Sequence, residues 1–188
     1  MRLFVAVDLS PETRAQVSDV QGQLGVALAS RRPPRISWVK PDGAHVTMRF
    51  LGEVPEQYVE RIANLLGSRQ LADRRFEIVW ETVGAFPDLR KPRVLWIGAT
   101  SGTESLGALA GVVRERLATV GSATEDRPFR PHVTIARVRD PGIGVSWPTA
   151  LSKVHLTPTI SPVDHVTLYQ SQLSPKGPRY TAMATFHF

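Results

Sequence analysis

The chain has 188 residues, 42% of them hydrophobic and 21% charged, and this composition suits a globular protein with a buried core. Its 23 Lys and Arg exceed its 17 Asp and Glu and leave a formal net charge of +6, which favours an anionic partner. The absence of cysteine excludes disulfides, thiolate nucleophiles and cysteine-ligated metals. No apolar run is long enough for a signal peptide or a membrane span. We therefore expect a cytoplasmic protein without a membrane partner, built as one domain over residues 1–188.

Strand-like and helical patterns alternate in the first half of the chain. Ser10 and Pro11 follow a short apolar run and supply an N-cap and a first-turn proline, so they mark the start of a helix. A loop rich in proline and arginine follows at 31–35. A later helix, with apolar residues at helical spacing, is expected to cover the first strand pair. The expected elements are a strand at 3–9, a helix from 10 to about 28, strands at 36–39 and 45–52, and that later helix over 55–66.

The second half repeats this alternation. Two β-rich runs flank a basic, proline-rich turn at 84–93 and predict a hairpin with an exposed basic tip. Gly121 is expected to end the helix that follows. Gly142 and Gly144 lack the third glycine and the preceding strand of a dinucleotide-binding turn, so that interpretation is discarded. The expected elements are strands at 76–83 and 94–99, a helix over 106–120, a strand from 132, a loop over 140–147 and a strand-rich tail over 154–188.

One tripeptide occurs twice in similar surroundings, as His45-Val46-Thr47 and as His132-Val133-Thr134. Side chains alternate along a strand, so the histidine and the threonine of each copy share one face while the valine points into the core. Two such imidazoles facing each other provide a general acid and a general base. The copies lie about half a chain apart, which indicates a duplicated α+β unit with the two strands facing across a cleft.

Four flanking residues are candidates for the same site. By strict alternation Arg49 and Arg130 share the imidazole face, whereas Phe50 and Arg137 lie on the opposite one. The last two occupy equivalent positions near strand ends, where twist or a bulge turns side chains to the other face. A phenyl ring and a guanidinium in those positions suit the two sides of a nucleobase.

The remaining histidines are interpreted as structural. His165 begins a third His-Val-Thr, but it has no nearby arginine and lacks the flanks of the other two copies. His155 and His187 have no motif around them. The sequence has no i, i+4 histidine pair and no carboxylate cluster, so it predicts neither a metal site nor a cofactor. We accordingly expect full activity in EDTA.

With these motifs and their flanks, the chain resembles the 2H phosphoesterase superfamily, specifically the RNA 2′,3′-cyclic phosphodiesterases historically called 2′-5′ RNA ligases. The resemblance covers nearly the whole chain, and departures such as Met48 are minor. The matching stretches are residues 2–7, 38–39, 45–47, 50–54, 84–87, 92–96, 129–137, 168–171 and 177–180.

The resemblance implies a two-lobed α+β fold with pseudo-twofold symmetry, in which two antiparallel sheets flank a central cleft and helices lie outside. It also implies metal-independent hydrolysis of RNA 2′,3′-cyclic phosphate ends to 2′-phosphates, with His45 as the acid and His132 as the base. Thr47 and Thr134 suit hydrogen bonds to the phosphate oxygens, and Arg130 or Arg137 suits a cationic clamp. We expect a monomer whose partner is RNA or a nucleotide with a cyclic phosphate end, tRNA halves included.

Two alternatives remain open. The same acid and base serve the reverse reaction, which joins a cyclic phosphate end to a 5′-hydroxyl through a 2′-5′ linkage. A noncatalytic RNA-binding module is the alternative from another class of protein, and it predicts salt-sensitive binding that survives the loss of both histidines.

Overall fold

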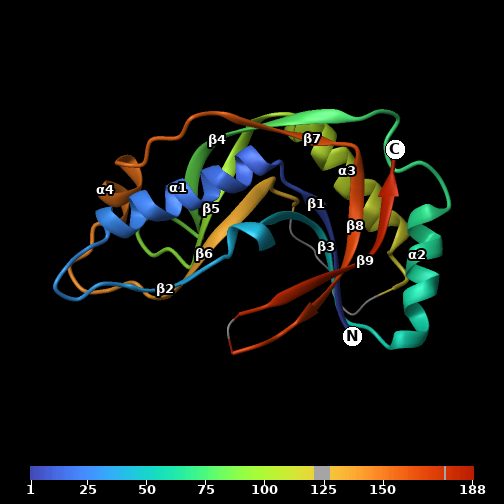
Figure 1. The fold of residues 1–188 in the computed structure, drawn as a ribbon, viewed down its shortest axis with the longest axis horizontal. Helices are drawn as coiled ribbons and strands as arrows, with labels where there is room; N and C mark the ends of the chain where they lie inside the picture. The colour runs from blue at the N-terminus through green and yellow to red at the C-terminus, as the bar shows by residue number, and fades with distance from the viewer. Residues whose placement is uncertain (121–127, 176) are drawn as a thin grey trace.

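The computed structural model describes residues 1–120, 128–175 and 177–188, and it shows two antiparallel sheets with helices packed against them (Figure 1). The expected α+β class is therefore confirmed. The elements are β1 (Arg2–Asp8), α1 (Pro11–Ala27), β2 (Arg35–Trp38), η1 (Pro41–Gly43), β3 (His45–Glu53), η2 (Glu56–Tyr58), α2 (Val59–Gly67), β4 (Phe76–Phe86), β5 (Val94–Ser101), α3 (Thr103–Arg116), β6 (His132–Asp140), α4 (Trp147–Ser152), β7 (Thr159–Val163), β8 (His165–Gln172) and β9 (Arg179–His187).

The strand orders of the two sheets correspond. One sheet has the order β3-β1-β8-β9 and the other the order β2-β6-β5-β4-β7, and all neighbouring strands are antiparallel. The unit β1-α1-β3 in the first sheet matches β5-α3-β6 in the second. Each motif strand, β3 or β6, thus lies beside the strand that precedes it in its own unit.

The helices of the two units are exchanged between the sheets. Although α1 follows β1, it packs against β7 of the five-stranded sheet, whereas α3 follows β5 and packs against β3 of the four-stranded sheet. Figure 1 shows this exchange, with α1 on the side of β4, β5 and β6 and α3 on the side of β8 and β9. The prediction that the helix over 55–66 covers the first strand pair was wrong. The observed helix α2 packs against α3 and β9, because α3 already occupies the face of β3.

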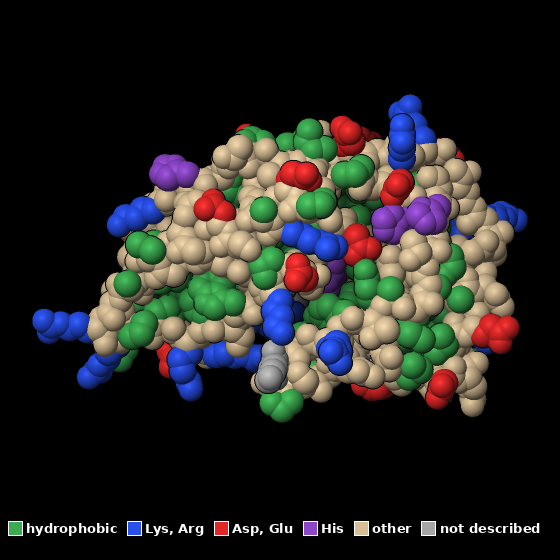
Figure 2. All heavy atoms as spheres, viewed as in Figure 1, with side chains coloured by type: hydrophobic (Ala, Val, Ile, Leu, Met, Phe, Trp, Pro, Cys, Tyr) green, Lys and Arg blue, Asp and Glu red, His purple; other side chains and the backbone are tan. Residues whose placement is uncertain are grey.

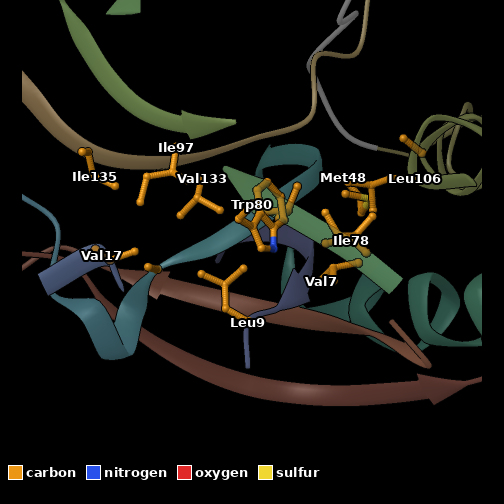
Figure 3. Close-up of a cluster of buried hydrophobic side chains, with 14 of the residues drawn as sticks. Val7, Leu9, Val17, Met48, Ile78, Trp80, Ile97, Leu106, Val133 and Ile135 are labelled. Atoms are coloured by element: carbon orange, nitrogen blue, oxygen red, sulfur yellow. The ribbon is translucent and has the colours of Figure 1, made fainter. Parts of the chain in front are cut away.

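Both sheets contribute to one continuous hydrophobic core (Figure 3). Met48 and Val133 enter it from the two motif strands, and Trp80 of β4 is fully buried. The indole Nε1 of Trp80 donates to Ser161 Oγ at 3.1 Å, so this buried polar atom is satisfied. One face of β3 and one face of β6 therefore pack into this core, and the histidine and threonine of each motif lie on the opposite face.

Local signals in the sequence located several boundaries well. Ser10 Oγ accepts from Thr13 N at 3.2 Å and caps α1, as predicted. The hairpin of β4 and β5 is confirmed, and its turn is closed by Arg93 N donating to Phe86 O at 2.7 Å. The predicted helix stop at Gly121 lies outside the described residues. Among the helices of the described ranges, none has the length and apolar character needed to cross a membrane.

Candidate active site

An irregularity in β3 determines which side chains face the cleft. His45 and Thr47 are half-buried on the open face, whereas Val46 and Met48 are buried. The register with β1 then slips, because Val5 pairs with Arg49 while Ala6 pairs with Thr47. This slip reverses the alternation, so the exposed Phe50 shares the face of His45.

The second motif strand, β6, has the same irregularity at the equivalent place. His132 and Thr134 are half-buried, and the register with β5 slips between the Leu95–Ala136 and Trp96–Thr134 pairs. Arg137 is consequently exposed on the face of His132. The expected turning of Phe50 and Arg137 toward the motif face is therefore what the structure shows.

The same slip makes the prediction for Arg49 wrong. Strict alternation placed Arg49 beside the imidazole, but only 9% of its surface is exposed. Its guanidinium donates from Nη1 to Arg114 O at 2.7 Å and so ties β3 to α3. Arg49 is accordingly a packing residue between a strand and a helix.

Both motif histidines are held by matching hydrogen bonds. Nδ1 of His45 lies 2.9 Å from Gly43 O, and Nδ1 of His132 lies 2.7 Å from Arg130 O. A carbonyl only accepts, so Nδ1 carries the hydrogen in each ring when the imidazole is neutral, and Nε2 then carries the lone pair. Nε2 of His45 lies 3.1 Å from Thr47 Oγ1.

The two imidazoles interact electrostatically. The pKa of His45 is lowered below 6.5, mainly by burial and also by the charge of His132. The hydrogen bond to Gly43 and the Asp8 carboxylate act in the opposite direction and raise this pKa. β3 and β6 also approach each other where the two sheets meet. The fold thus brings residues from distant parts of the sequence, His45 and His132, to one place.

Aromatic rings surround both histidines. Phe4 stacks on His45 with ring centroids 4.7 Å apart, and Tyr180 meets the same imidazole edge-on at 5.3 Å. On the other strand, Phe86 meets His132 edge-on at 5.1 Å. The guanidinium of Arg130 lies 5.9 Å from the centre of the Phe86 ring, a cation–π distance. Rings therefore pack against both imidazoles and help to hold them in orientation.

A pocket of about 530 Å³ opens beside His45. Its walls combine aromatic rings, carboxylates and cations, and the sequence interpretation gave these side chains no role. Phe4 was hidden in an apolar run, while Tyr169 and Tyr180 stood in stretches that matched the family without a motif of their own. The residues that line it are Phe4, Asp8, Lys40, Asp42, Gly43, Ala44, His45, Tyr169, Gln172, Leu173, Ser174, Gly177, Pro178, Arg179 and Tyr180.

The third His-Val-Thr belongs to a hydrogen-bond network around Asp8. Thr167 Oγ1 and Tyr169 OH donate to the Asp8 carboxylate at 3.1 and 2.7 Å. His165 Nε2 lies 3.3 Å from Asp8 Oδ2, and Nδ1 of the same ring faces Asp164. Burial, reinforced by Asp8, raises the pKa of Tyr169 to about 12, so its hydroxyl remains a donor. Both nitrogens of His165 face carboxylates, which sets this histidine apart from the other two motif copies.

The fold and the paired strands define a class of protein in which two antiparallel sheets each carry a histidine and a threonine on a strand at the place where the sheets meet. The sequence profile of the 2′-5′ RNA ligase superfamily matches residues 9–174, and the chain belongs to that superfamily.

Relatives of the same length support this assignment. The chain is 34% identical to an RNA 2′,3′-cyclic phosphodiesterase of Archaeoglobus fulgidus over 189 residues, which cover 99% of each chain. The crystal structure of TT0787 of Thermus thermophilus matches with a TM-score of 0.77 and 29% identity, over 100% of this chain and 97% of that one. E. coli LigT complexed with 3′-AMP matches with a TM-score of 0.74 and 28% identity, over 99% of this chain and 97% of that one.

Proposed function

We propose that this protein hydrolyses the 2′,3′-cyclic phosphate ends of RNA to 2′-phosphomonoesters. The observation that carries the proposal is the pair of motif histidines, each with Nδ1 bound to the carbonyl two residues earlier, so that Nε2 is the nitrogen we assign to proton transfer in each ring. Full-length relatives named RNA 2′,3′-cyclic phosphodiesterase support the substrate class. LigT complexed with 3′-AMP supports a nucleotide at the cleft.

The proposed step is an in-line displacement at phosphorus. Nε2 of His132 takes a proton from water as the water oxygen bonds to phosphorus. The bond from phosphorus to the ribose O3′ breaks, and Nε2–H of His45 donates a proton to that oxygen. The products are a 2′-phosphate and a free 3′-hydroxyl. Burial of His45 opposes its protonation, so the anionic phosphate is needed nearby to hold the imidazolium that acts as the acid.

The other site residues are assigned to binding the phosphate and the base. Thr47 and Thr134 donate to the nonbridging oxygens, on which negative charge increases in the transition state. Arg130, just before β6, and Arg137, within β6, are exposed cations that add charge-assisted hydrogen bonds. Phe50, 42% exposed and on the His45 face, offers a ring on which a nucleobase stacks.

The first test is the loss of each motif histidine. We expect His45→Ala and His132→Ala each to lower kcat on a 2′,3′-cyclic nucleotide by about 10²–10⁴-fold, because each removes one proton transfer. Phosphorus NMR of the wild-type reaction should show a 2′-phosphate.

The matched control is His155→Ala, which removes an exposed histidine and should leave kcat unchanged. Unchanged turnover in either motif variant would refute the assignment. Loss of turnover in His165→Ala alone would show that the third copy had been wrongly set aside. RNA binding without turnover in the wild type would favour the noncatalytic module.

A 2′-5′ ligation is the second candidate function, favoured by the superfamily to which the chain belongs. The same two imidazoles serve it, with an RNA 5′-hydroxyl in place of water as the group that loses a proton. Incubation with paired tRNA halves separates the two reactions, because only ligation yields a product resistant to nucleases specific for 3′-5′ linkages.

Catalysis in the presence of EDTA is the next prediction. Two imidazoles supply the proton transfers, and two threonines with cations supply the charge stabilisation, so the proposed step uses no metal ion. We expect the rate on a 2′,3′-cyclic nucleotide to be the same with and without EDTA. A rate that falls with EDTA and returns with a divalent cation, in the wild type and in His187→Ala alike, would contradict this mechanism.

A further inference from the structure

A second cluster of chemically active side chains lies where β8 begins and β9 ends. His165 and His187 are directly opposite in the register of these strands, and their ring centroids are 5.2 Å apart. Asp164 precedes His165, and each of the three residues offers one ligand atom within 4.8 Å of the other two. Figure 2 shows histidine side chains gathered at the surface beside acidic ones, toward the end of the molecule where Figure 1 places the C-terminus.

The two ring nitrogens of His165 both face carboxylate oxygens. Nδ1 lies 2.5 Å from Asp164 Oδ1, and Nε2 lies 3.3 Å from Asp8 Oδ2. A neutral imidazole has one N–H and donates to only one of these carboxylates, so its other lone pair faces an oxygen. A positively charged species, either a second proton or a metal ion, relieves that repulsion.

Asp8 determines which nitrogen is left for the metal. Its carboxylate is held by hydrogen bonds from Thr167 and Tyr169, and Arg14 Nη2 lies 3.8 Å away. So fixed, it accepts from Nε2 of His165 and turns the Nδ1 lone pair toward Asp164. A carboxylate that accepts from the far nitrogen is the usual partner of a metal-bound histidine, because it fixes the tautomer and the ring orientation.

We propose that Asp164, His165 and His187 bind one divalent transition-metal ion with the ligand preference of Zn²⁺. Two imidazole nitrogens and one carboxylate oxygen are a common donor set for this ion, and water completes the tetrahedron. The side chains of Asp164 and His187 are exposed, so they can turn to place their ligand atoms around one ion at bond lengths of about 2.0–2.2 Å.

The ion has a structural role distinct from the proposed catalytic pair. It joins the end of β9 to the start of β8, and β9 is the edge strand of its sheet. The same strand carries Tyr180, which touches His45. Because the ion binds only the folded state, it stabilises the sheet edge that forms one wall of the pocket.

Titration of the metal-free full chain with Co²⁺, followed by visible absorption, tests the site. We expect one equivalent to bind with a tetrahedral spectrum, and Zn²⁺ to displace it and raise the Tm. His187→Ala and Asp164→Ala should each abolish the spectrum. His155→Ala, the matched control, should leave it unchanged. Asp8→Asn should weaken binding by about 10–100-fold, the usual effect of losing such a carboxylate.

Three outcomes would overturn the proposal. The first is no tetrahedral Co²⁺ spectrum in the wild type. The second is a spectrum that persists in His187→Ala. The third is a spectrum that disappears in His45→Ala or His132→Ala, which would place the ion between the motif histidines instead. Circular dichroism of each variant shows whether it is folded, and a ligand variant that fails to fold is replaced by His187→Gln.

Discussion

A slip of one residue in each motif strand decides which side chains reach the proposed active site. The alternation of a strand predicted correctly that His45 and Thr47 share a face, and likewise His132 and Thr134. It failed beyond the threonine, where the register with the neighbouring strand shifts and buries Arg49 instead of Phe50. Bulges of this kind depend on how the strand pairs with its neighbour in the sheet, and this pairing cannot be read from the residues of one strand.

The lowered pKa of His45 predicts how stability depends on pH. Its pKa is lowered in the folded protein, so the unfolded chain binds more protons as the pH falls below about 6.5. The free energy of unfolding should therefore decrease through that window and should not depend on this group above it. Urea unfolding of the wild type at about pH 7.5 and about pH 5.5 measures the decrease, since these values bracket an ordinary histidine pKa.

The comparison that isolates His45 is with His45→Asn, in which the decrease should be smaller. His155→Asn should retain the decrease of the wild type because it removes an exposed histidine. An equal decrease in the wild type and in His45→Asn would assign the pH dependence to other groups.

At the scale of helices and strands, capping and periodicity located most elements. Ser10 and Pro11 marked the start of α1, and the proline-rich turn marked the hairpin of β4 and β5. These signals could not predict which strands each helix packs against, because an apolar stripe shows which face of a helix is buried but not what covers that face. The exchange of α1 and α3 between the sheets is accordingly the main feature of the fold that sequence patterns missed.

The hairpin also depends on two glycines that make room for an indole. A Cβ on Gly84 would lie 2.3 Å from Trp96 Cζ2, and one on Gly98 would lie 2.7 Å from Trp96 Cζ3. Trp96 in turn packs on Phe86, the ring that contacts His132. The glycines thus set the position of the aromatic support of one motif histidine.

We expect Gly84→Ala to destabilise the protein by about 1–3 kcal/mol, the usual cost of overpacking, and to lower kcat by displacing Phe86. Denaturant unfolding and turnover of a 2′,3′-cyclic nucleotide measure the two effects. The control is Gly107→Ala in α3, where a Cβ meets no heavy atom of the described residues within 4 Å. That variant should gain up to about 1 kcal/mol from helix propensity. A Gly84→Ala protein as stable as the wild type would show that Trp96 moves aside freely.

At the scale of the whole molecule, the net charge of +6 is consistent with an RNA partner. Exposed cations occupy the loop before β2 and the tip of the β4–β5 hairpin, where Arg90 and Lys91 lie. Figure 2 shows Lys and Arg side chains projecting from the molecule on several sides, with carboxylates between them elsewhere. The sequence predicted an anionic partner and a basic hairpin tip, and the fold shows that Arg90 and Lys91 are exposed at that tip.

Removal of the cations at the hairpin tip should weaken RNA binding in a salt-dependent way. We expect Arg90→Ala/Lys91→Ala to raise KM for an oligoribonucleotide with a cyclic phosphate end, and to reduce the slope of log KM against log salt by about 0.7 for each phosphate that is no longer neutralised. The turn itself should survive, because Asp88 Oδ1 holds it through the backbone N–H groups of both residues.

The charge-matched control is Arg74→Ala/Arg75→Ala, which alters the exposed segment before β4. It should leave both KM and the slope near the wild-type values. A 2′,3′-cyclic mononucleotide, which has no further phosphates for the tip to neutralise, should show no difference among the three proteins. Equal slopes for the wild type and the tip variant would show that the hairpin does not bind the RNA chain.

The exchanged helices have a consequence for how the chain can be divided. A polypeptide holding only one of the two units would keep a helix but lose the main surface that this helix covers, because α3 packs mainly on β3 of the other unit and α1 mainly on β7 of the other sheet. Two fragments that together hold all these elements would bury the same surfaces by associating as an intertwined complex. In the intact chain this association is intramolecular and does not depend on protein concentration. If the chain were cut between the two units, folding would depend on the concentration of the fragments.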